Sequence, residues 1–370
     1  MTTETAFHPR LAAMTDQWMD LFGYWAPTVV TTTGEEYRAV RERAGLMDFS
    51  MLRKVDLTGP GARDLVASVM TRDLAKLAPG HIAYGAIVDE EGRMVDDCTA
   101  SVLGPDRVRF CGANDRDADL LAERAADSKV AVEVLTDRLP HLCVQGPASR
   151  TLLQPLADAD LSNAAFPYYT CREGVSIGGI PVFMTRLGYT AELGYELWVG
   201  RDRALELWDL LVEAGHPHGM AVVGMDALDL LRIEGGFIIG GVEYDATTSP
   251  FECGLGWTVD LDRGDFLGKK ALAADKEAID VRLASVVLEE GGASATGAPL
   301  TVEGQTVGTV TQAISSPHLG GATLGLAKLR RPHNRRGTAV TARLADREVP
   351  GEVIRHPAYD PERKRVKDQA

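Results

Sequence analysis

Two adjacent carboxylates, Asp96 and Asp97, are the side chains of this sequence whose position is hardest to explain by packing. They open the second of two apolar runs, residues 84–88 and 100–103, which a short turn at residues 89–92 separates. The pattern predicts a β-hairpin with an acidic pair at the entry to its second strand. Strands disfavour aspartate, so a carboxylate there either points to water, which is the commoner outcome, or faces a polar cavity. In a cavity it would be a candidate general acid or base.

A second candidate site is the segment 186–196, which is dense in glycines, aromatic residues and carboxylates. Tyr189 and Tyr195 offer flat faces and hydroxyl groups. Glu192 or Glu196 has the two oxygens needed to accept parallel N–H bonds from a planar heterocycle. From composition alone, a hairpin loop with exposed charges explains the segment equally well.

The composition is that of an ordinary globular protein with room for two or three domains: 370 residues, 45% hydrophobic and 25% charged. The net charge of −14 argues against nucleic acid as a partner. The N-terminus lacks a basic segment followed by an apolar core, and no apolar run approaches the length of a membrane span. We therefore expect neither membrane binding nor secretion, and a cytoplasmic location.

Cysteine and histidine give no metal signature. The five cysteines are scattered without a C-x-x-C pair, and the eight histidines show no recognised ligand spacing. This usage favours a reducing compartment, and we expect no bound metal.

The hydrophobic spacing predicts irregularly ordered helices and strands, which indicates an α+β protein and not a doubly wound parallel sheet. Helices are expected at residues 35–44, 62–70, 117–126, 149–156, 204–214 and 224–234. Strands are expected at residues 54–58, 84–88, 100–103, 108–111, 130–135, 142–145, 180–185 and 196–199. The succession of a strand, a Gly-Pro pair and a helix occurs twice, which is a weak sign of an internal repeat.

The pattern changes near residue 281 to short strands divided by glycines. This predicts a compact C-terminal β-barrel of about 80 residues. The expected division is residues 1–140 and 141–280 as two α+β domains and residues 281–370 as the barrel domain, and the first domain is allowed to include parts of the middle region. The last dozen residues are charged and are expected to fray.

In their order along the chain, several short strings resemble the glycine-cleavage T-protein family of tetrahydrofolate-dependent aminomethyltransferases and their demethylase relatives. Each string is weak alone, but together they cover nearly the whole chain. They are Arg-Ala-Gly-Leu-Met-Asp-Phe-Ser at 43–50, Gln-Gly-Pro at 145–147, Gly-Tyr-Thr-Ala-Glu-Leu-Gly-Tyr-Glu at 188–196, Leu-Arg-Ile-Glu at 231–234, Phe-Leu-Gly-Lys at 266–269 and Pro-Ala-Tyr-Asp-Pro at 357–361.

The resemblance implies a three-domain cloverleaf ring that holds tetrahydrofolate in a central channel. It makes Asp97 the catalytic acid/base residue, with Asp96 as its more exposed neighbour, and Glu196 the residue that holds the pterin edge. It further implies folate-binding roles for Tyr84, Tyr189, Tyr359 and Met51.

Several positions depart from the family pattern. Leu228 replaces an arginine that contacts folate in the true glycine-cleavage enzymes, and Cys111 replaces an asparagine. Met51 and Leu52, which follow Ser50, also differ from the family pattern, and this alters the expected substrate-side wall of the channel. Because the carboxylates on the pterin side are kept, these departures indicate the same cofactor and a different one-carbon donor.

The function that the resemblance favours is a tetrahydrofolate-dependent one-carbon transferase. It would demethylate a small N-, O- or S-methylated compound and give 5-methyl- or 5,10-methylenetetrahydrofolate. One alternative is the aminomethyltransferase of the glycine cleavage system, with a lipoyl carrier protein as partner, and another is a non-catalytic folate-binding protein. A basic cluster is either a solvated loop or a site for the anionic folate tail; it comprises Arg330, Arg331, His333, Arg335 and Arg336.

Overall fold

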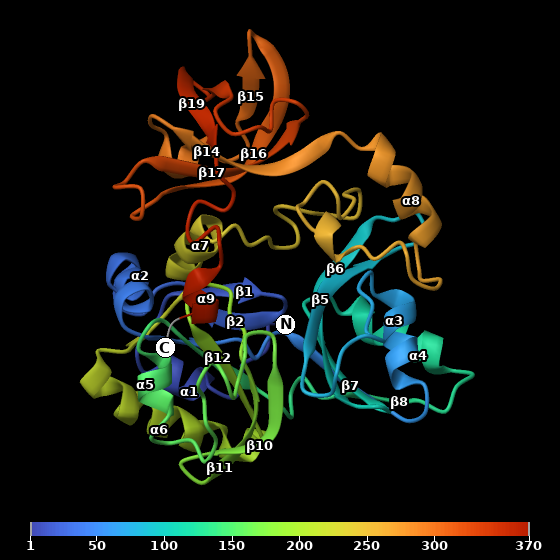
Figure 1. Cartoon of the computed structure of the whole chain (residues 1–370). Helices are drawn as coiled ribbons and strands as arrows, with labels where there is room; N and C mark the ends of the chain where they lie inside the picture. Colours follow the sequence, from blue (N-terminus) through green and yellow to red (C-terminus); the bar gives the residue numbers. More distant parts are fainter. Residues whose placement is uncertain (1, 369–370) are drawn as a thin grey trace.

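The computed structural model describes residues 2–368 and shows three modules arranged around a common centre (Figure 1). One module contains a five-stranded sheet, the second a six-stranded sheet and the third a closed barrel. The expected α+β ring with a C-terminal barrel is therefore confirmed. None of the helices within residues 2–368 is long and apolar enough to cross a membrane.

The five-stranded sheet is antiparallel, and helices α3 and α4 pack on one of its faces. Val55, Val66 and Phe110 belong to its buried core. In the order β5-β6-β7-β4-β8, its strands are β5 (Ile82–Val88), β6 (Met94–Gly104), β7 (Arg107–Gly112), β4 (Arg53–Thr58) and β8 (Ala131–Val134); the helices are α3 (Ala62–Val69) and α4 (Arg116–Ala125).

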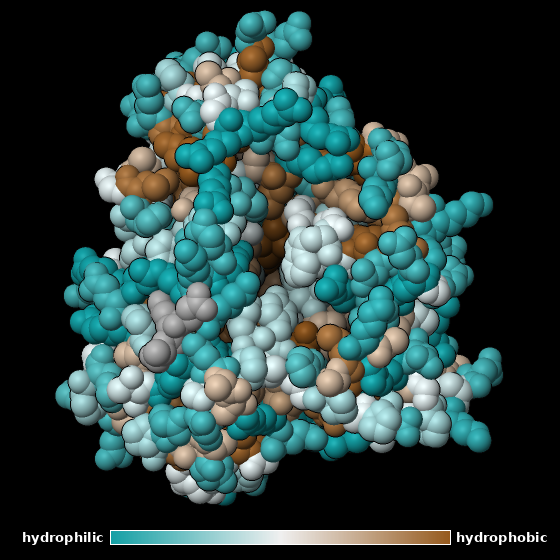
Figure 2. Space-filling view, in the orientation of Figure 1, coloured by the Kyte–Doolittle hydropathy of each residue, from teal (hydrophilic) through white to brown (hydrophobic). Residues whose placement is uncertain are grey.

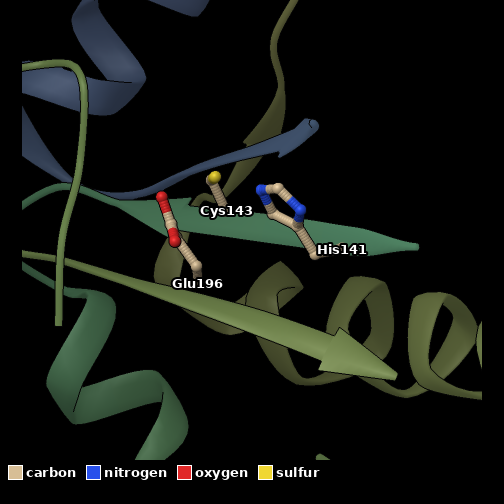
Figure 3. A group of neighbouring side chains, drawn as sticks. All are labelled: His141, Cys143 and Glu196. Atoms are coloured by element: carbon tan, nitrogen blue, oxygen red, sulfur yellow. The ribbon is translucent and has the colours of Figure 1, made fainter. Parts of the chain in front are cut away.

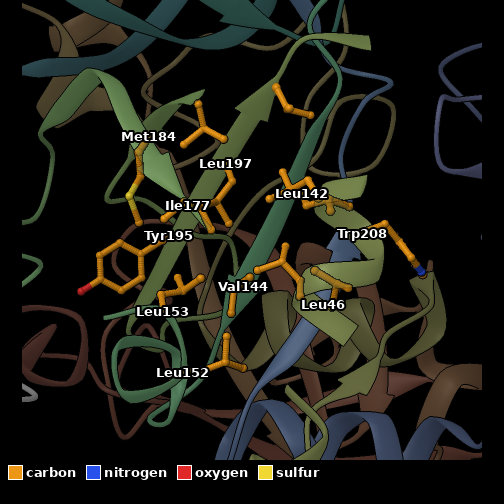
Figure 4. Packing of buried hydrophobic residues seen from close by; sticks show 14 of the residues in the cluster. Leu46, Leu142, Val144, Leu152, Leu153, Ile177, Met184, Tyr195, Leu197 and Trp208 are labelled. Carbon is orange, nitrogen blue, oxygen red and sulfur yellow. The ribbon is translucent and has the colours of Figure 1, made fainter. Parts of the chain in front are cut away.

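The six-stranded sheet has a buried core of leucines, valines and aromatic residues beneath helices α5 and α6 (Figure 4). Its one parallel pair in the described chain joins β13 to β3. In spatial order the strands are β10 (Cys171–Ile177), β11 (Ile180–Thr185), β12 (Gly194–Val199), β9 (His141–Gln145), β3 (Gly45–Asp48) and β13 (Ala221–Val222); the helices are α5 (Ser149–Leu153) and α6 (Ala204–Gly215).

The sheet memberships cut across the division expected at residue 140. Strand β3 lies inside the six-stranded sheet, and Phe7 and Leu11 are buried in the core of that sheet. The N-terminal segment therefore belongs structurally to the middle module. Its other elements are α1 (His8–Leu11), β1 (Trp18–Leu21), β2 (Tyr24–Pro27) and α2 (Thr33–Glu42).

The barrel closes because β19 pairs with β14, which leaves no free sheet edge. Its strands are β14 (Val281–Leu288), β15 (Pro299–Val302), β16 (Gln305–Ser315), β17 (Thr323–Arg330), β18 (Ala339–Arg343) and β19 (Glu348–Ile354).

Outside the sheets, the chain forms α7 (Met225–Glu234), α8 (Lys269–Ala278) and α9 (Lys364–Asp368). One apolar cluster joins β5, α7, α8 and the barrel through Ala86, Ile233, Leu272 and Leu324.

The repeated succession of strand, Gly-Pro pair and helix has a structural basis in two glycines, Gly59 after β4 and Gly146 after β9. Both adopt positive φ, at 127° and 125°. A Cβ on either residue would collide with a backbone carbonyl oxygen, of Lys129 for the first and of Arg43 for the second. Only glycine therefore allows each strand to turn so closely past its neighbour before the helix begins.

The C-terminal tail is ordered through residue 368, so the expectation that it frays is wrong for residues 359–368. Tyr359 and Val366 are 6% and 4% exposed. The buried guanidinium of Arg186 donates to the Val366 carbonyl at 2.7 Å. The charged composition of the tail hid these contacts.

A buried ion cluster around Arg41 joins the modules. Arg41 on α2 donates to Glu234 at the end of α7 at 2.8 Å and to Glu192 at 3.3 Å. Glu234 also accepts from the hydroxyl of Ser316, which follows the barrel strand β16, at 2.6 Å. The Tyr359 amide donates to the Glu234 carbonyl at 2.8 Å. Since both glutamates are at most 1% exposed, their charges depend on these partners.

We predict that Glu234→Ala lowers the free energy of unfolding by about 3–5 kcal/mol, because it leaves Arg41 with one buried counter-charge where it had two. Urea denaturation measures this. The matched control is Glu348→Ala, which breaks an exposed pair with Arg343 and should cost less than about 1 kcal/mol. Equal costs for the two variants would contradict a central role for the Arg41 cluster.

Candidate functional site

Asp97 lies in the middle of the paired region of β6, opposite Ala86 of β5. The Tyr84 hydroxyl donates to its Oδ2 at 2.8 Å, and the Tyr244 hydroxyl donates to its Oδ1 at 2.7 Å. None of the ion pairs within residues 2–368 involves Asp97. The carboxylate is therefore held by two neutral donors and has no neighbouring cation to stabilise its charge.

Burial, and then the charge of Asp96, raise the pKa of Asp97 to about 7. The two tyrosine hydroxyls act in the opposite direction because they stabilise the ionised form. A carboxyl group that titrates near neutral pH is suited to take up or release a proton during a reaction.

Asp96 is 2% exposed, so the expectation that it is the exposed member of the pair is wrong. It accepts the backbone N–H groups of Ala113 at 2.5 Å and Asn114 at 3.1 Å, and the Tyr244 hydroxyl lies 3.0 Å from its other oxygen. Alternate residues of a strand face opposite sides of the sheet. Asp96 shares its face with Cys98, which packs beneath the helices, and Asp97 points to the other side.

Tyr244 is a residue of the candidate site that the sequence did not reveal. It lies in the loop after α7, is 4% exposed, and its single hydroxyl reaches both Asp96 and Asp97. The Asp97 amide also donates to this hydroxyl at 3.2 Å. No periodicity or turn motif marks the loop, and the contact spans almost 150 residues of sequence.

Glu196 lies in a second polar group, on the face that β9 and β12 share (Figure 3). Its Oε2 accepts from the Thr185 hydroxyl at 2.7 Å and the Trp198 indole at 3.4 Å. His141 stacks on Trp198, and neither of its ring nitrogens has a hydrogen-bond partner among the described residues. The side chains of His141, Cys143 and Glu196 stand on the same side of the sheet.

Lys54 supplies the positive charge of this second group. Its ammonium is buried and donates to the carbonyls of Ser50 at 2.8 Å and Leu52 at 2.9 Å. Burial lowers its pKa to about 8, while the thiol of Cys111 and the carboxylates of Asp48 and Glu196 act in the opposite direction.

His141, Cys143 and Glu196 have ligand atoms within 4.8 Å of one another and offer donors that zinc accepts. The Lys54 ammonium already acts as a counter-charge for Glu196, so a second cation would be repelled there. That the protein holds no metal stays a prediction.

The structure brings some of the other predicted residues together. Met51 is 2% exposed and lies in one apolar cluster with Tyr189 and Leu228. The Tyr189 hydroxyl donates to the Ile238 carbonyl. Tyr359 lies instead in the Arg41 cluster, where its ring is 3.7 Å from the guanidinium carbon. Its contact with folate stays a prediction.

The basic cluster follows β17 on the loop before β18, and its four arginines are exposed. The Arg331 amide donates to the Asp280 carbonyl near the end of α8 at 2.9 Å. The opposite end of β17 lies beside the loop that carries Ser316 toward Glu234. Binding of the folate tail by this cluster stays a prediction.

Residues 7–263 match the GCVT N-terminal domain, and residues 282–360 match the glycine cleavage T-protein C-terminal barrel domain. The chain belongs to the glycine-cleavage T-protein family. The crystal structure of aminomethyltransferase T from Bartonella henselae has the same T-protein fold, with a TM-score of 0.88 over 98% of this chain and 99% of its own, at 23% identity.

Two kinds of relative stand out. The aminomethyltransferase of Halothermothrix orenii is 32% identical over 92% of this chain and 95% of its own length. The trimethylamine-oxide aldolase of Ruegeria pomeroyi is 34% identical over 99% of this chain but 48% of its own length. This chain therefore spans about half of the aldolase and nearly all of the aminomethyltransferase.

The polar groups of the structure fit a pterin. Both hydrogen bonds that Glu196 accepts within the described chain go to Oε2, and His141 has two unsatisfied ring nitrogens. Unsatisfied buried polar atoms cost free energy unless a ligand pairs with them. In the orientation of Figure 1, the molecular surface is hollowed at the centre over apolar residues (Figure 2).

We predict that Asp97→Asn stabilises the protein near pH 8 by about 2–4 kcal/mol and has little effect near pH 4. The pKa of Asp97 is raised in the folded state, so wild-type stability falls as pH rises from the unfolded pKa through about 7. Asparagine mimics the protonated form and avoids that loss. Urea denaturation at both pH values measures the effect, with exposed Asp119→Asn as the control. A destabilised Asp97→Asn protein near pH 8 would contradict the argument.

Proposed function

We propose that this protein is a tetrahydrofolate-dependent one-carbon transferase that demethylates a small N-, O- or S-methylated compound. The T-protein family consists of tetrahydrofolate-dependent one-carbon transferases, and its named relatives are enzymes. The observation that carries the proposal is Asp97, a carboxyl group that two tyrosine hydroxyls hold and whose pKa is raised to about 7. A methyl donor would give 5-methyltetrahydrofolate, and a donor whose carbon is already at the oxidation level of formaldehyde, such as an aminomethyl group, would give 5,10-methylenetetrahydrofolate.

When bound, tetrahydrofolate supplies a nucleophilic amine that accepts the one-carbon unit. In the proposed mechanism, Asp97 orients this amine, stabilises the positive charge that develops on it and takes up its proton. Tyr84 and Tyr244 hold the two oxygens of Asp97 and fix the direction of its free lone pairs. Glu196 accepts the N–H groups of the pterin edge, and its neighbours Thr185 and Trp198 keep its carboxylate in one orientation.

The donor side favours demethylation over the glycine-cleavage reaction. Leu228, which stands where the family carries a folate-contacting arginine, is 7% exposed and packs in the same apolar cluster as Met51. The match to the trimethylamine-oxide aldolase, which covers 99% of this chain and 48% of the aldolase, supports this choice because a similar module occurs in a protein named for a methylated nitrogen compound. The aminomethyltransferase reaction is the second candidate, because this chain covers 95% of one such relative.

We expect the purified protein to form 5-methyltetrahydrofolate from at least one methylated metabolite, or 5,10-methylenetetrahydrofolate from an aminomethyl-type donor, as detected by mass spectrometry. The parallel reaction contains tetrahydrofolate and aminomethylated lipoyl carrier protein, and it is assayed for ammonia. Ammonia release without turnover of any methylated compound would establish the second candidate. The Asp97→Asn protein is the control for uncatalysed transfer.

We predict that two variants separate chemistry from binding. Asp97→Asn should lower turnover by about 10²–10⁴-fold, because it removes the proton acceptor, and keep tetrahydrofolate affinity within a few-fold. Glu196→Gln should weaken tetrahydrofolate binding by roughly 10–100-fold, because it removes charged hydrogen bonds. Isothermal titration calorimetry and single-turnover kinetics measure both effects. Near wild-type turnover in Asp97→Asn, or unchanged affinity in Glu196→Gln, would remove the assigned role.

A further inference from the structure

Asp117 is a buried carboxyl group that the proposed mechanism does not use. It lies in the first turn of α4 and is 0% exposed, and neither of its oxygens has a hydrogen-bond partner among the described residues. Its Oδ2 and the Oδ2 of Asp96 both stand where a Cβ on Gly112 would collide with them. The glycine therefore leaves room for two carboxyl groups side by side.

Two carboxylates at such close range cannot both stay ionised away from water, so one of them holds a proton. Asp96 accepts the backbone N–H groups of Ala113 at 2.5 Å and Asn114 at 3.1 Å, whereas the Asn114 amide has only a minor effect on the pKa of Asp117. Burial, and then the Asp96 charge, raise the pKa of Asp117 far above its usual range. A protonated Asp117 is a donor, and Asp96 is the acceptor beside it.

Tyr244 has a single hydroxyl proton, so a second donor to Asp96, such as a protonated Asp117, affects which carboxylate Tyr244 can serve. The hydroxyl lies 2.7 Å from Asp97 and 3.0 Å from Asp96, and it donates to one of them at a time. When Asp97 is ionised and Tyr244 donates to it, Asp96 needs another donor. When Asp97 is protonated, it can donate to the Tyr244 oxygen, and the hydroxyl turns to Asp96.

We propose that Asp117 is a positioning residue that donates its proton to Asp96 and so leaves the Tyr244 hydroxyl available to the ionised form of Asp97. The proposal rests on the proposed function only in making Asp97 the group that exchanges protons. Besides Asp96 and Asp97, the titratable groups near Asp117 are the thiols of Cys98 on β6 and Cys111 on β7. Burial raises the pKa of both thiols, so they stay neutral.

The test compares Asp117→Asn with Asp117→Leu. The asparagine amide keeps a donor to Asp96, and the leucine keeps only the volume. In Asp117→Leu, the Tyr244 hydroxyl donates to Asp96 and no longer to Asp97. The loss of this hydrogen bond raises the pKa of Asp97, so the acid limb of the kcat–pH profile should move up by about one pH unit. Asp117→Asn should keep the wild-type midpoint. Asp119→Asn, an exposed residue on the same helix, is the matched control.

An infrared measurement tests the proton without any substrate. Near pH 8, wild-type protein and Asp97→Asn should both show the carbonyl stretch of a protonated carboxyl group, and Asp117→Asn should lack it. Absence of the band in wild type, or its persistence in Asp117→Asn, would overturn the inference. The inference also fails if Asp117→Leu folds and keeps the wild-type pH midpoint. A present band in a protein that transfers no one-carbon unit would instead refute the proposed function alone.

Discussion

The burial of charge around Arg41 is the constraint on which the arrangement of the modules depends. Arg41 and Arg365 face Glu192 and Glu234, so two guanidinium groups balance two carboxylates in a largely dry place. The partners come from α2, α7, the barrel loop and the C-terminal tail, so displacement of the barrel would remove the Ser316 hydrogen bond to Glu234, and displacement of the tail would remove Arg365 from Glu192. Apolar packing alone would tolerate sliding between modules, whereas charged hydrogen bonds require one geometry.

The same physics produces the reactive group. Asp97 is partly buried, whereas Glu234 is fully buried. The side-chain donors to Asp97 are hydroxyl groups, and desolvation and the Asp96 charge raise its pKa to about 7. Glu234 instead pairs with the Arg41 guanidinium at 2.8 Å. The absence of a neighbouring cation among the described residues keeps the pKa of Asp97 high. A cation beside Asp97 would stabilise its charge and make it a poor proton acceptor.

The sequence predicted local structure well, because hydrophobic spacing reports which face of an element is buried. Helices α2, α3 and α4 and the barrel appear where the pattern placed them. Long-range polar contacts were not predictable in this way. The burial of Asp96 depends on backbone amides 17 and 18 residues away, and Tyr244 reaches it across 148 residues. The place of β3 in the six-stranded sheet was not predicted for the same reason, because its partners β9 and β13 lie far along the chain.

The departures from the family pattern at positions 51 and 228 lie near one of the two polar groups of the candidate site. Leu228 and Met51 are both buried in the apolar cluster that also contains Cys143, whose neighbour across the sheet is Glu196. An arginine at position 228 would bring a charge into this cluster and would need a carboxylate partner. With leucine there, the wall is apolar and the cations near Glu196 reduce to Lys54 among the described residues. Under the proposed function, an apolar wall suits a methyl donor, and Asp97 and Glu196 keep their roles toward folate when the donor side changes.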